Sequence, residues 1–401
     1  MKTVNALRAR RILTLADAQP AARRNDLLAP LPVLDNAVIL SKNGLVLAVE
    51  PYAHCKRRTG CVIEDAGEVT LVPGLINAHS HVELAGLKGK TRLGQGFAAW
   101  VRSVIDLKQA QGCSEADMAR AAEEMSEHGT VHVGDIVSEA PVAGTGAFFR
   151  AGISVSVFRE CFGFQPAQTL DALRAVYLAD MPERLLPHCA LSGHALFSTH
   201  PHTLRLARQD CEERGQTFTM HLAEHDEELH CLLNGSGPLN DALRERGVLP
   251  LDHRPPGRRP VQYAHELGLL GKNTLAVHCV HCDETEAELL AATGASVCLC
   301  PRSNAAINTG GAAPVDLFMD KGVLLCLGTD SPASNSDLNL WNEARALREA
   351  HQLPAHALLR LMTVNAAHAL RRPELGRLAP GYRAAWAALP EDFAVQGAAN
   401  L

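Results

Sequence analysis

The chain has 401 residues, of which 47% are hydrophobic and 20% are charged, and its formal net charge is −6. This composition is typical of a globular protein, and the acidic balance excludes the basic surface that nucleic-acid-binding proteins carry. The sequence also lacks an apolar run long enough to span a membrane, and residues 1–11 lack the apolar core of a signal peptide. We therefore expect a cytoplasmic protein that binds neither nucleic acid nor membranes.

The first seventy residues alternate short β-rich stretches with turns. Strands are predicted at residues 11–16, 37–40, 45–49 and 69–72. The pair Asn43-Gly44 lies between two of these strands and predicts a hairpin. Residues 19–33 are rich in Pro and Ala, which favours an insertion loop. This part of the chain, residues 1–70, therefore predicts a small β domain.

From residue 71 onward, predicted strands alternate with predicted helices. Residues 114–128 predict an amphipathic helix. Ser114 and Asp117 form a capping-box pattern at its start, and Gly129 is a stop signal at its end. Eight buried-type strands are predicted at residues 71–78, 130–136, 153–158, 189–192, 218–221, 275–278, 296–300 and 323–327. This alternation predicts an α/β fold, a (β/α)8 TIM barrel over residues 71–370.

Two further stretches complete the predicted organisation. Residues 235–260 are rich in Pro, Gly and Arg and predict a long loop after a strand. Residues 384–389 follow a Pro-Gly turn and predict a strand that returns to the N-terminal sheet. The small domain is then a discontinuous β-sandwich made of residues 1–70 and 371–401.

Two histidines end the first of the eight predicted strands. His79 and His81 close an apolar run that begins at Val72. Residues i and i+2 of a strand point to the same face, so the two imidazoles project together. Such a pair also occurs by chance on surface strands, and the other strand ends therefore decide what it means.

Three more predicted strands end in residues that are suited to a metal site. These residues are His221 and Glu224 after the fifth strand, His278 at the end of the sixth and Asp330 after the eighth. Because the active site of a barrel lies at the carboxyl ends of its strands, we expect these side chains to meet. Burial alone does not explain ionisable residues at the ends of four apolar strands, so the set predicts a metal-dependent active site.

The motifs P-G-x-x-x-x-H-x-H, H-x-x-E and G-T-D resemble those of the amidohydrolase superfamily, and the resemblance extends from about Asn5 to Leu389. It implies that one divalent metal is held by His79, His81, His221 and Asp330. This donor set suits zinc and also fits iron. Two-metal members of the superfamily need a bridging lysine on the fourth strand, and the chain has no lysine between Lys108 and Lys272. The resemblance therefore implies a one-metal site and the deaminase branch.

These residue types indicate a hydrolytic reaction. A metal lowers the pKa of its bound water to about 7, and the resulting hydroxide would attack an amino-bearing ring carbon. Asp330 would take the proton of that water. Glu224 would protonate the adjacent ring nitrogen, and His278 would polarise the attacking oxygen. Collapse of the tetrahedral species would then release ammonia.

Secondary motifs, including Phe97-x-x-Trp100 and Phe158-Arg159-Glu160, most resemble the aminodeoxyfutalosine deaminases of an alternative menaquinone pathway. They are less closely similar to S-adenosylhomocysteine/adenosine deaminases and to triazine hydrolases. The residues expected at the substrate are Glu83, Trp100, Arg159, His194 and Arg302. We expect Glu83 to contact the purine edge, Trp100 the face of the base and His194 the ribose. One of the two arginines would bind a carboxylate. The expected partner is a small molecule, and we expect a homodimer.

Each of these residues also has a structural alternative. Glu83 can cap a helix, Arg159 can pair with a neighbouring carboxylate, and Arg302 can fasten a loop. His194 can be structural, and the aromatic residues near Trp100 can belong to the core. His225 follows the predicted acid in a position where Ser or Thr is expected, and a second imidazole there can alter specificity.

Three competing functions stay open. One is a hydrolase of the same fold that releases chloride or an alkylamine from a triazine. Another is a non-catalytic scaffold of this fold, which the complete set of polar residues disfavours. The third is a zinc module formed by Cys279, Cys282, Cys298 and Cys300. Their spacing more simply predicts small buried residues on or beside adjacent strands.

Overall fold

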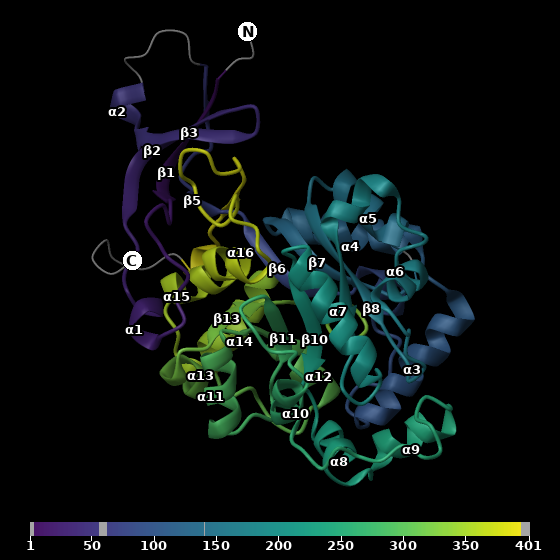
Figure 1. The fold of residues 1–401 in the computed structure, drawn as a ribbon. Coiled ribbons are helices and arrows are strands. Elements are labelled where there is room, and N and C mark those ends of the chain that lie inside the picture. Colours follow the sequence, from purple (N-terminus) through teal and green to yellow (C-terminus); the bar gives the residue numbers. More distant parts are fainter. Residues whose placement is uncertain (1–3, 56–61, 140, 394–401) are drawn as a thin grey trace.

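The computed structural model describes residues 4–55, 62–139 and 141–393. Two four-stranded parallel sheets lie at its centre, and a separate mixed sheet lies to one side (Figure 1). The first parallel sheet contains, in order, β6 (Leu75–Ser80), β7 (Thr130–Val137), β8 (Ser154–Cys161) and β9 (Cys189–Gly193). The second contains β10 (Phe218–Leu222), β11 (Thr274–His278), β12 (Ser296–Leu299) and β13 (Leu324–Leu327).

The two parallel sheets meet at both edges. Between β9 and β10, the backbone N–H of His221 donates to the carbonyl oxygen of His194 over 2.9 Å. Between β6 and β13, Ser80 and Asp330 form a parallel bridge. The backbone N–H of Asp330 also donates to the carbonyl oxygen of His79 over 3.1 Å. The arrangement is of the TIM-barrel type.

The strands of these sheets are almost entirely buried and are rich in apolar residues. Every residue of β6, β9, β10, β11 and β12 is buried. Strands that are covered on both faces form continuous hydrophobic runs rather than an alternating pattern, which is how they appear in the sequence. Phe158, Phe218 and Ile76 are among the largest fully buried side chains. Polar side chains therefore gather at the strand ends, where the site forms.

Helices follow the strands and cover the outside of the parallel sheets (Figure 1). In the first half these are a 3-10 helix (Val82–Leu87), α3 (Phe97–Gln111), α4 (Glu115–Glu127), α5 (Pro141–Arg150), α6 (Leu170–Tyr177), a 3-10 helix (Glu183–His188) and α7 (Pro201–Glu213). The Ser114 hydroxyl accepts the backbone N–H of Asp117 over 3.3 Å, so the predicted cap of α4 is confirmed.

The second half adds α8 (Asp226–Asn234), α9 (Pro238–Glu245), α10 (Pro260–Glu266), α11 (Glu284–Thr293), α12 (Pro301–Ile307), α13 (Val315–Lys321), α14 (Leu340–His351), α15 (Ala355–Arg360), a π-helix (Leu361–Asn365), α16 (Ala366–Ala369) and a 3-10 turn (Glu391–Phe393). Throughout the described ranges, every helix is too short or too polar to cross a membrane.

The mixed sheet joins strands from the two ends of the described chain. Its order is β14 (Trp386–Ala388), β5 (Thr70–Pro73), β1 (Asn5–Leu13), β2 (Val33–Lys42) and β3 (Leu45–Pro51), with β4 (Ile63–Asp65) also beside β1. A one-turn helix, α2 (Tyr52–Cys55), follows β3. Because β14 pairs antiparallel with β5, the predicted return of the tail is confirmed. Over residues 4–55, 62–139 and 141–393 this part forms one sheet, and the second layer of the expected β-sandwich is not shown.

Three elements differ from their sequence predictions. β1 begins at Asn5 rather than at residue 11, because arginines interrupt its apolar pattern and pair across the sheet with Asp35 and Asp65. The expected insertion loop contains the one-turn helix α1 (Arg24–Leu27). The expected long loop after β10 contains α9, which buries Leu239, Ala242 and Leu243 at helical spacing.

Candidate metal centre and substrate cavity

The four predicted metal ligands meet where the two parallel sheets join. His79 lies on β6, and His81 directly follows that strand. His221 lies on β10, and Asp330 follows β13 by three residues. Their side chains are between 1% and 12% exposed. The strand-end pattern therefore brings these four residues together in one buried cluster.

One side-chain atom of each ligand points into the cluster. The Nε2 atom of His81 lies 3.1 Å from Nε2 of His79 and 3.3 Å from Nε2 of His221. Asp330 Oδ1 lies 3.4 Å from His79 Nε2 and 3.5 Å from His81 Nε2. Tetrahedral zinc with bonds of about 2.0–2.1 Å sets its ligand atoms roughly 3.3 Å apart. The spacing of the donor atoms therefore fits one zinc-sized divalent ion.

The protonation of the imidazoles also suits a cation. His221 donates its Nδ1–H to the carbonyl oxygen of His194 over 2.9 Å, which leaves the Nε2 lone pair facing the cluster. Burial lowers the pKa of His81 to about 3, and the nearby His79 acts in the same direction. Burial likewise holds the pKa of His221 well below its ordinary value. Neutral imidazoles at this spacing direct their lone pairs at one another, an arrangement that a metal ion stabilises.

The carboxylate of Asp330 is fixed by two serines. Ser303 and Ser334 both donate to Oδ2, the latter over 2.8 Å, so Oδ1 remains directed at the histidines. Burial alone would raise the pKa of Asp330, but the hydrogen bond with His79 and nearby imidazoles bring it well below its ordinary value. Behind this group, a Cβ at Gly328 would lie 2.8 Å from His79 Cβ, so only glycine permits this close approach of the strands.

Glu224 and His278 form a second pair beside the cluster. Their Oε1 and Nε2 atoms are 3.4 Å apart. His278 donates Nδ1–H to the Oδ1 atom of Asn304 over 2.8 Å, and Glu228 accepts the backbone N–H of Glu224 over 2.8 Å. Burial raises the pKa of Glu224 well above its ordinary value, and it lowers the pKa of His278 to about 4. Glu224 is thus suited to hold a proton, whereas His278 is a neutral imidazole whose Nε2 lone pair faces Glu224.

The backbone is unusual at these strand ends. Ala223, His278, Cys279 and Asp330 all have left-handed backbone angles, with φ of 52°, 74°, 48° and 56°. Such angles cost non-glycine residues on the order of 1–3 kcal/mol each and gather at functional sites. The turns therefore direct the side chains of His278 and Asp330 at the cluster against the local backbone preference.

A cavity of about 900 Å³ opens onto the cluster. His81, His221, Glu224, His278 and Asp330 line its polar end. The helix α3 supplies much of the remaining wall, with apolar contributions from Phe97, Trp100, Val101, Val104 and Ile105. A flat heterocycle can therefore stack on the apolar wall while its edge faces the metal cluster.

Three of the five predicted substrate residues line this cavity: Glu83, Trp100 and His194. Trp100 donates its indole N–H to the carbonyl oxygen of Ala333 over 3.1 Å. Glu83 accepts from Lys108 Nζ over 2.8 Å and from the backbone N–H groups of residues 138 and 139 over 3.2 and 3.0 Å. Glu83 thus holds the turn after β7 rather than capping a helix.

The structure does not bring Arg159 and Arg302 to the cavity wall. Arg159 donates to the carbonyl oxygens of Tyr177 and Ser138 over 2.9 and 2.6 Å and pairs with Asp180. Arg302 binds both carboxylate oxygens of Asp337 over 2.7 Å. The guanidinium of Arg302 therefore fastens the loop after β13, which is the structural alternative for that residue.

Sequence reasoning missed Glu160 as a cavity residue. Side chains of a strand alternate between its two faces, so Glu160 shares the face of Phe158, and Arg159 points to the helix side of β8. Glu160 lines the cavity, and burial raises its pKa to about 7, with the charge of Glu83 acting in the same direction. The alternation of side chains along β8 was the sequence signal that could have identified Glu160. Arg102, Lys108 and Arg246 also line the cavity, but no local pattern marks them.

His225 and the paired cysteines lie outside the cavity lining. His225 Nε2–H donates to the carbonyl oxygen of Asn308 over 2.9 Å, and its ring caps α8. Burial raises the pKa of the Cys298 thiol well above its ordinary value and that of Cys300 to about 12. Zinc binds thiolates, so these buried thiols favour the packing interpretation of the cysteines.

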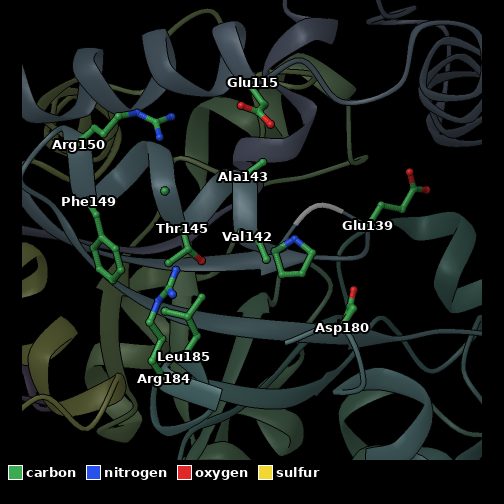
Figure 2. Close-up of a pocket in the computed structure, with 12 residues that line it drawn as sticks. Glu115, Glu139, Val142, Ala143, Thr145, Phe149, Arg150, Asp180, Arg184 and Leu185 are labelled. Carbon is green, nitrogen blue, oxygen red and sulfur yellow. The ribbon is translucent and has the colours of Figure 1, made fainter. Parts of the chain in front are cut away.

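A second hollow, of about 500 Å³, lies beside α5 (Figure 2). Arg150, Arg184, Asp180 and Glu139 are among the twelve residues that line it. Glu139 borders both hollows, and Asp180 is the ion-pair partner of Arg159. None of the predicted metal ligands is among these twelve residues, so the chemistry of the site belongs to the larger cavity.

Comparison with protein families gives a match to the amidohydrolase family over residues 70–398. A 5-methylthioadenosine/S-adenosylhomocysteine deaminase of Nitratidesulfovibrio vulgaris is 29% identical over 373 residues, which cover 87% of this chain and 78% of the relative. A protein of the same name from Haloarcula marismortui is 30% identical over 344 residues, or 82% and 74% of the two chains.

Solved structures share the fold at lower identity. Aminofutalosine deaminase of Helicobacter pylori, in complex with methylthio-coformycin, matches with a TM-score of 0.80 and 21% identity, covering 95% of this chain and 91% of that one. A zinc-bound adenosine deaminase of Xanthomonas campestris matches with a TM-score of 0.76 and 22% identity, covering 96% and 84%.

Proposed function

We propose that this chain, which belongs to the amidohydrolase family, is a hydrolytic deaminase that releases ammonia from an adenine-type nucleoside. One observation carries the proposal. Three imidazole nitrogens and one carboxylate oxygen converge beside the buried carboxyl of Glu224, at the end of a cavity with an aromatic wall. The names of the curated relatives, which are deaminases of adenosine derivatives, support the same reaction class.

We further infer the finer architecture that this function implies. The two parallel sheets would form one closed (β/α)8 barrel over residues 71–370. The small β domain would comprise residues 1–70 and 371–401, for which the pairing of β14 with β5 is the support. Such a barrel presents its strand ends to a single catalytic face.

The proposed metal ligands are His79, His81, His221 and Asp330. When bound, a divalent metal lowers the pKa of a coordinated water to about 7 and so supplies a strong nucleophile at neutral pH. The nitrogen-rich donor set suits zinc best, and iron fits it as well. A zinc-bound structure among the neighbours is compatible with this choice.

The proton transfers are assigned to residues of this chain. Asp330, whose Oδ1 is directed away from the serines, takes up a proton as the water attacks. Glu224 delivers a proton to the ring nitrogen beside the amino-bearing carbon, because burial raises its pKa and so favours the protonated form. His278, held by Asn304, lies 3.4 Å from Glu224 and polarises the attacking oxygen. The proton that Asp330 has taken up then passes to the leaving amine.

The rest of the cavity selects the substrate. Trp100 and its apolar neighbours on α3 cover the face of the base, and His194 lies where it can meet the ribose. The cavity of about 900 Å³ is larger than a plain nucleoside needs, so we propose a substituent at the ribose 5′ position. Sequence resemblance favours aminodeoxyfutalosine, whereas the relatives' names favour 5-methylthioadenosine or S-adenosylhomocysteine.

Ammonia release from a substrate panel tests the proposal. Zinc-loaded protein is assayed with adenosine, 5-methylthioadenosine, S-adenosylhomocysteine, aminodeoxyfutalosine and a chlorinated triazine. We expect turnover of one or more nucleosides and none by a His79→Ala/His81→Ala variant. Turnover of the triazine alone, with release of chloride or alkylamine, would show that the nucleoside assignment is wrong.

A further inference from the structure

Glu160 has an open hydrogen-bonding atom inside the cavity. Its side chain is 8% exposed, and Oε2 accepts from the Ser138 hydroxyl over 3.1 Å. Within the described ranges, Oε1 is buried and has no hydrogen-bond partner. The nearest imidazole nitrogen, His221 Nδ1, is 4.0 Å away and already donates to the carbonyl oxygen of His194. A buried polar atom without a partner costs free energy that a bound group can offset.

The neighbouring carboxylate of Glu83 is differently placed. Its oxygens accept from Lys108 and from two backbone N–H groups, so its hydrogen-bonding capacity serves the turn at residues 138 and 139. Among the residues that the structure describes, no lysine or arginine pairs with Glu160, which lines the same cavity. Of the two adjacent carboxyl groups, Glu160 is therefore the one that is open to a ligand.

His194 lies beside Glu160 in the same wall. Side-chain atoms of Glu160, His194 and His221 that can bind a ligand lie within 4.8 Å of one another. The Nδ1 atom of His194 is bonded to the hydroxyl of Ser198, so its other ring nitrogen is left for the cavity. Two polar groups this close together can each face one of two hydroxyls on adjacent carbons.

We propose that Glu160 determines specificity by binding a hydroxyl of the substrate's ribose through Oε1, with His194 beside the neighbouring hydroxyl. This inference rests on the proposed nucleoside deaminase function and adds the requirement for a ribose diol. A hydroxyl both donates and accepts, so it satisfies Oε1 whether or not the carboxyl carries a proton. Ring nitrogens of a purine only accept, and its amino group belongs at the metal end of the cavity.

The experiment compares adenosine with 2′-deoxyadenosine and 3′-deoxyadenosine in ammonia release. In the wild type, loss of the bound hydroxyl should lower kcat/KM by at least about tenfold, the worth of a charged hydrogen bond. Glu160→Ala should lower kcat/KM for adenosine and leave the deoxy analogue that lacks this hydroxyl nearly unaffected. The ratio between the two substrates then falls to within about twofold. Glu160→Gln, which keeps an acceptor oxygen, should retain part of the ratio.

Asp135→Asn is the matched control. Asp135 is a buried carboxyl on the adjacent strand β7, it accepts the backbone N–H of Val82 over 2.9 Å, and it is outside the cavity lining. Its substitution should leave the ribose-to-deoxyribose ratio unchanged. Zinc content, measured for every variant, shows that the metal cluster is intact.

Two results would overturn the role of Glu160. One is a wild type that processes all three nucleosides within about twofold of one another, which needs no variant to observe. The other is a Glu160→Ala variant that loses activity equally on adenosine and both deoxy analogues. If none of the nucleosides in the substrate panel is deaminated, the proposed function fails, and calorimetric binding of adenosine and its two deoxy analogues then tests Glu160. Equal affinities, or no binding at all, would contradict the proposal.

Discussion

Substitution of Glu224 by glutamine separates proton transfer from metal binding. Glutamine has nearly the same shape, and the backbone N–H of Glu224 that Glu228 accepts is unchanged, so the side chain should stay in place. The substitution removes the proton that burial keeps on this carboxyl. Loss of a positioned general acid typically costs about 10²–10⁴ in rate, or about 2.7–5.4 kcal/mol of activation free energy. We therefore expect kcat to fall at least about 100-fold with little change in KM.

The assay is steady-state ammonia release on the preferred nucleoside, with zinc measured in the same sample. Zinc should remain near one equivalent, because none of the four proposed ligands is altered. Glu227→Gln is the matched control: this neighbouring glutamate, on α8, is outside the cavity lining, and its substitution should affect kcat far less. Near-normal turnover of Glu224→Gln would refute the assignment of the acid. Loss of zinc from this variant would instead mean that Glu224 holds the metal.

Three further predictions follow from the same geometry. We expect one equivalent of divalent metal per chain and loss of that metal in His79→Ala/His81→Ala. Two equivalents with full activity, or zinc retained through the cysteines, would contradict this expectation. Arg159→Met should change kcat/KM equally for carboxylated and plain nucleosides, because the guanidinium of Arg159 contacts residues 138, 177 and 180. A selective loss on the carboxylated substrate would instead place Arg159 at the ligand. Burial raises the pKa of Asp337, but the hydrogen bond from Arg302 outweighs burial and brings this pKa down to about 2. The pair therefore stabilises the fold fully above about pH 4, and this stabilisation is lost as the pH falls towards 2. The difference in urea midpoint between wild type and Arg302→Met should shrink over that range, and a constant difference would mean that the ion pair is not its cause.

The sequence predicted that the four proposed metal ligands converge, because the signal there is local. A histidine pair at i and i+2 fixes a shared face, and an ionisable residue after an apolar strand marks the carboxyl end of that strand. His79, His81, His221 and Asp330 each follow one of these two rules. Applied to β8, the same period of two selects Glu160 for the cavity face and places Arg159 on the opposite face. Arg159 was predicted at the substrate because its charge was considered before the face of the strand on which it lies.

Long-range contacts account for what the sequence could not predict. Lys108 lies on α3, twenty-five residues from Glu83, and no periodic pattern indicates that the two form a 2.8 Å ion pair. The helix α9 was expected to be a loop because Pro and Gly dominate its surroundings. Its Leu239, Ala242 and Leu243 are buried at helical spacing, and tertiary packing outweighs the local breakers.

The four proposed metal ligands lie at the two seams where the parallel sheets meet. The carbonyl oxygen of His79 accepts the backbone N–H of Asp330, so the hydrogen bond that joins β6 to β13 also sets two ligands side by side. At the other seam, the carbonyl oxygen of His194 accepts both the backbone N–H and the Nδ1–H of His221. Each seam therefore positions ligands through the contacts that bring the sheets together. A metal ion bound to all four residues links both seams, and its binding should stabilise the folded state by mass action, as a rise in melting temperature with added zinc.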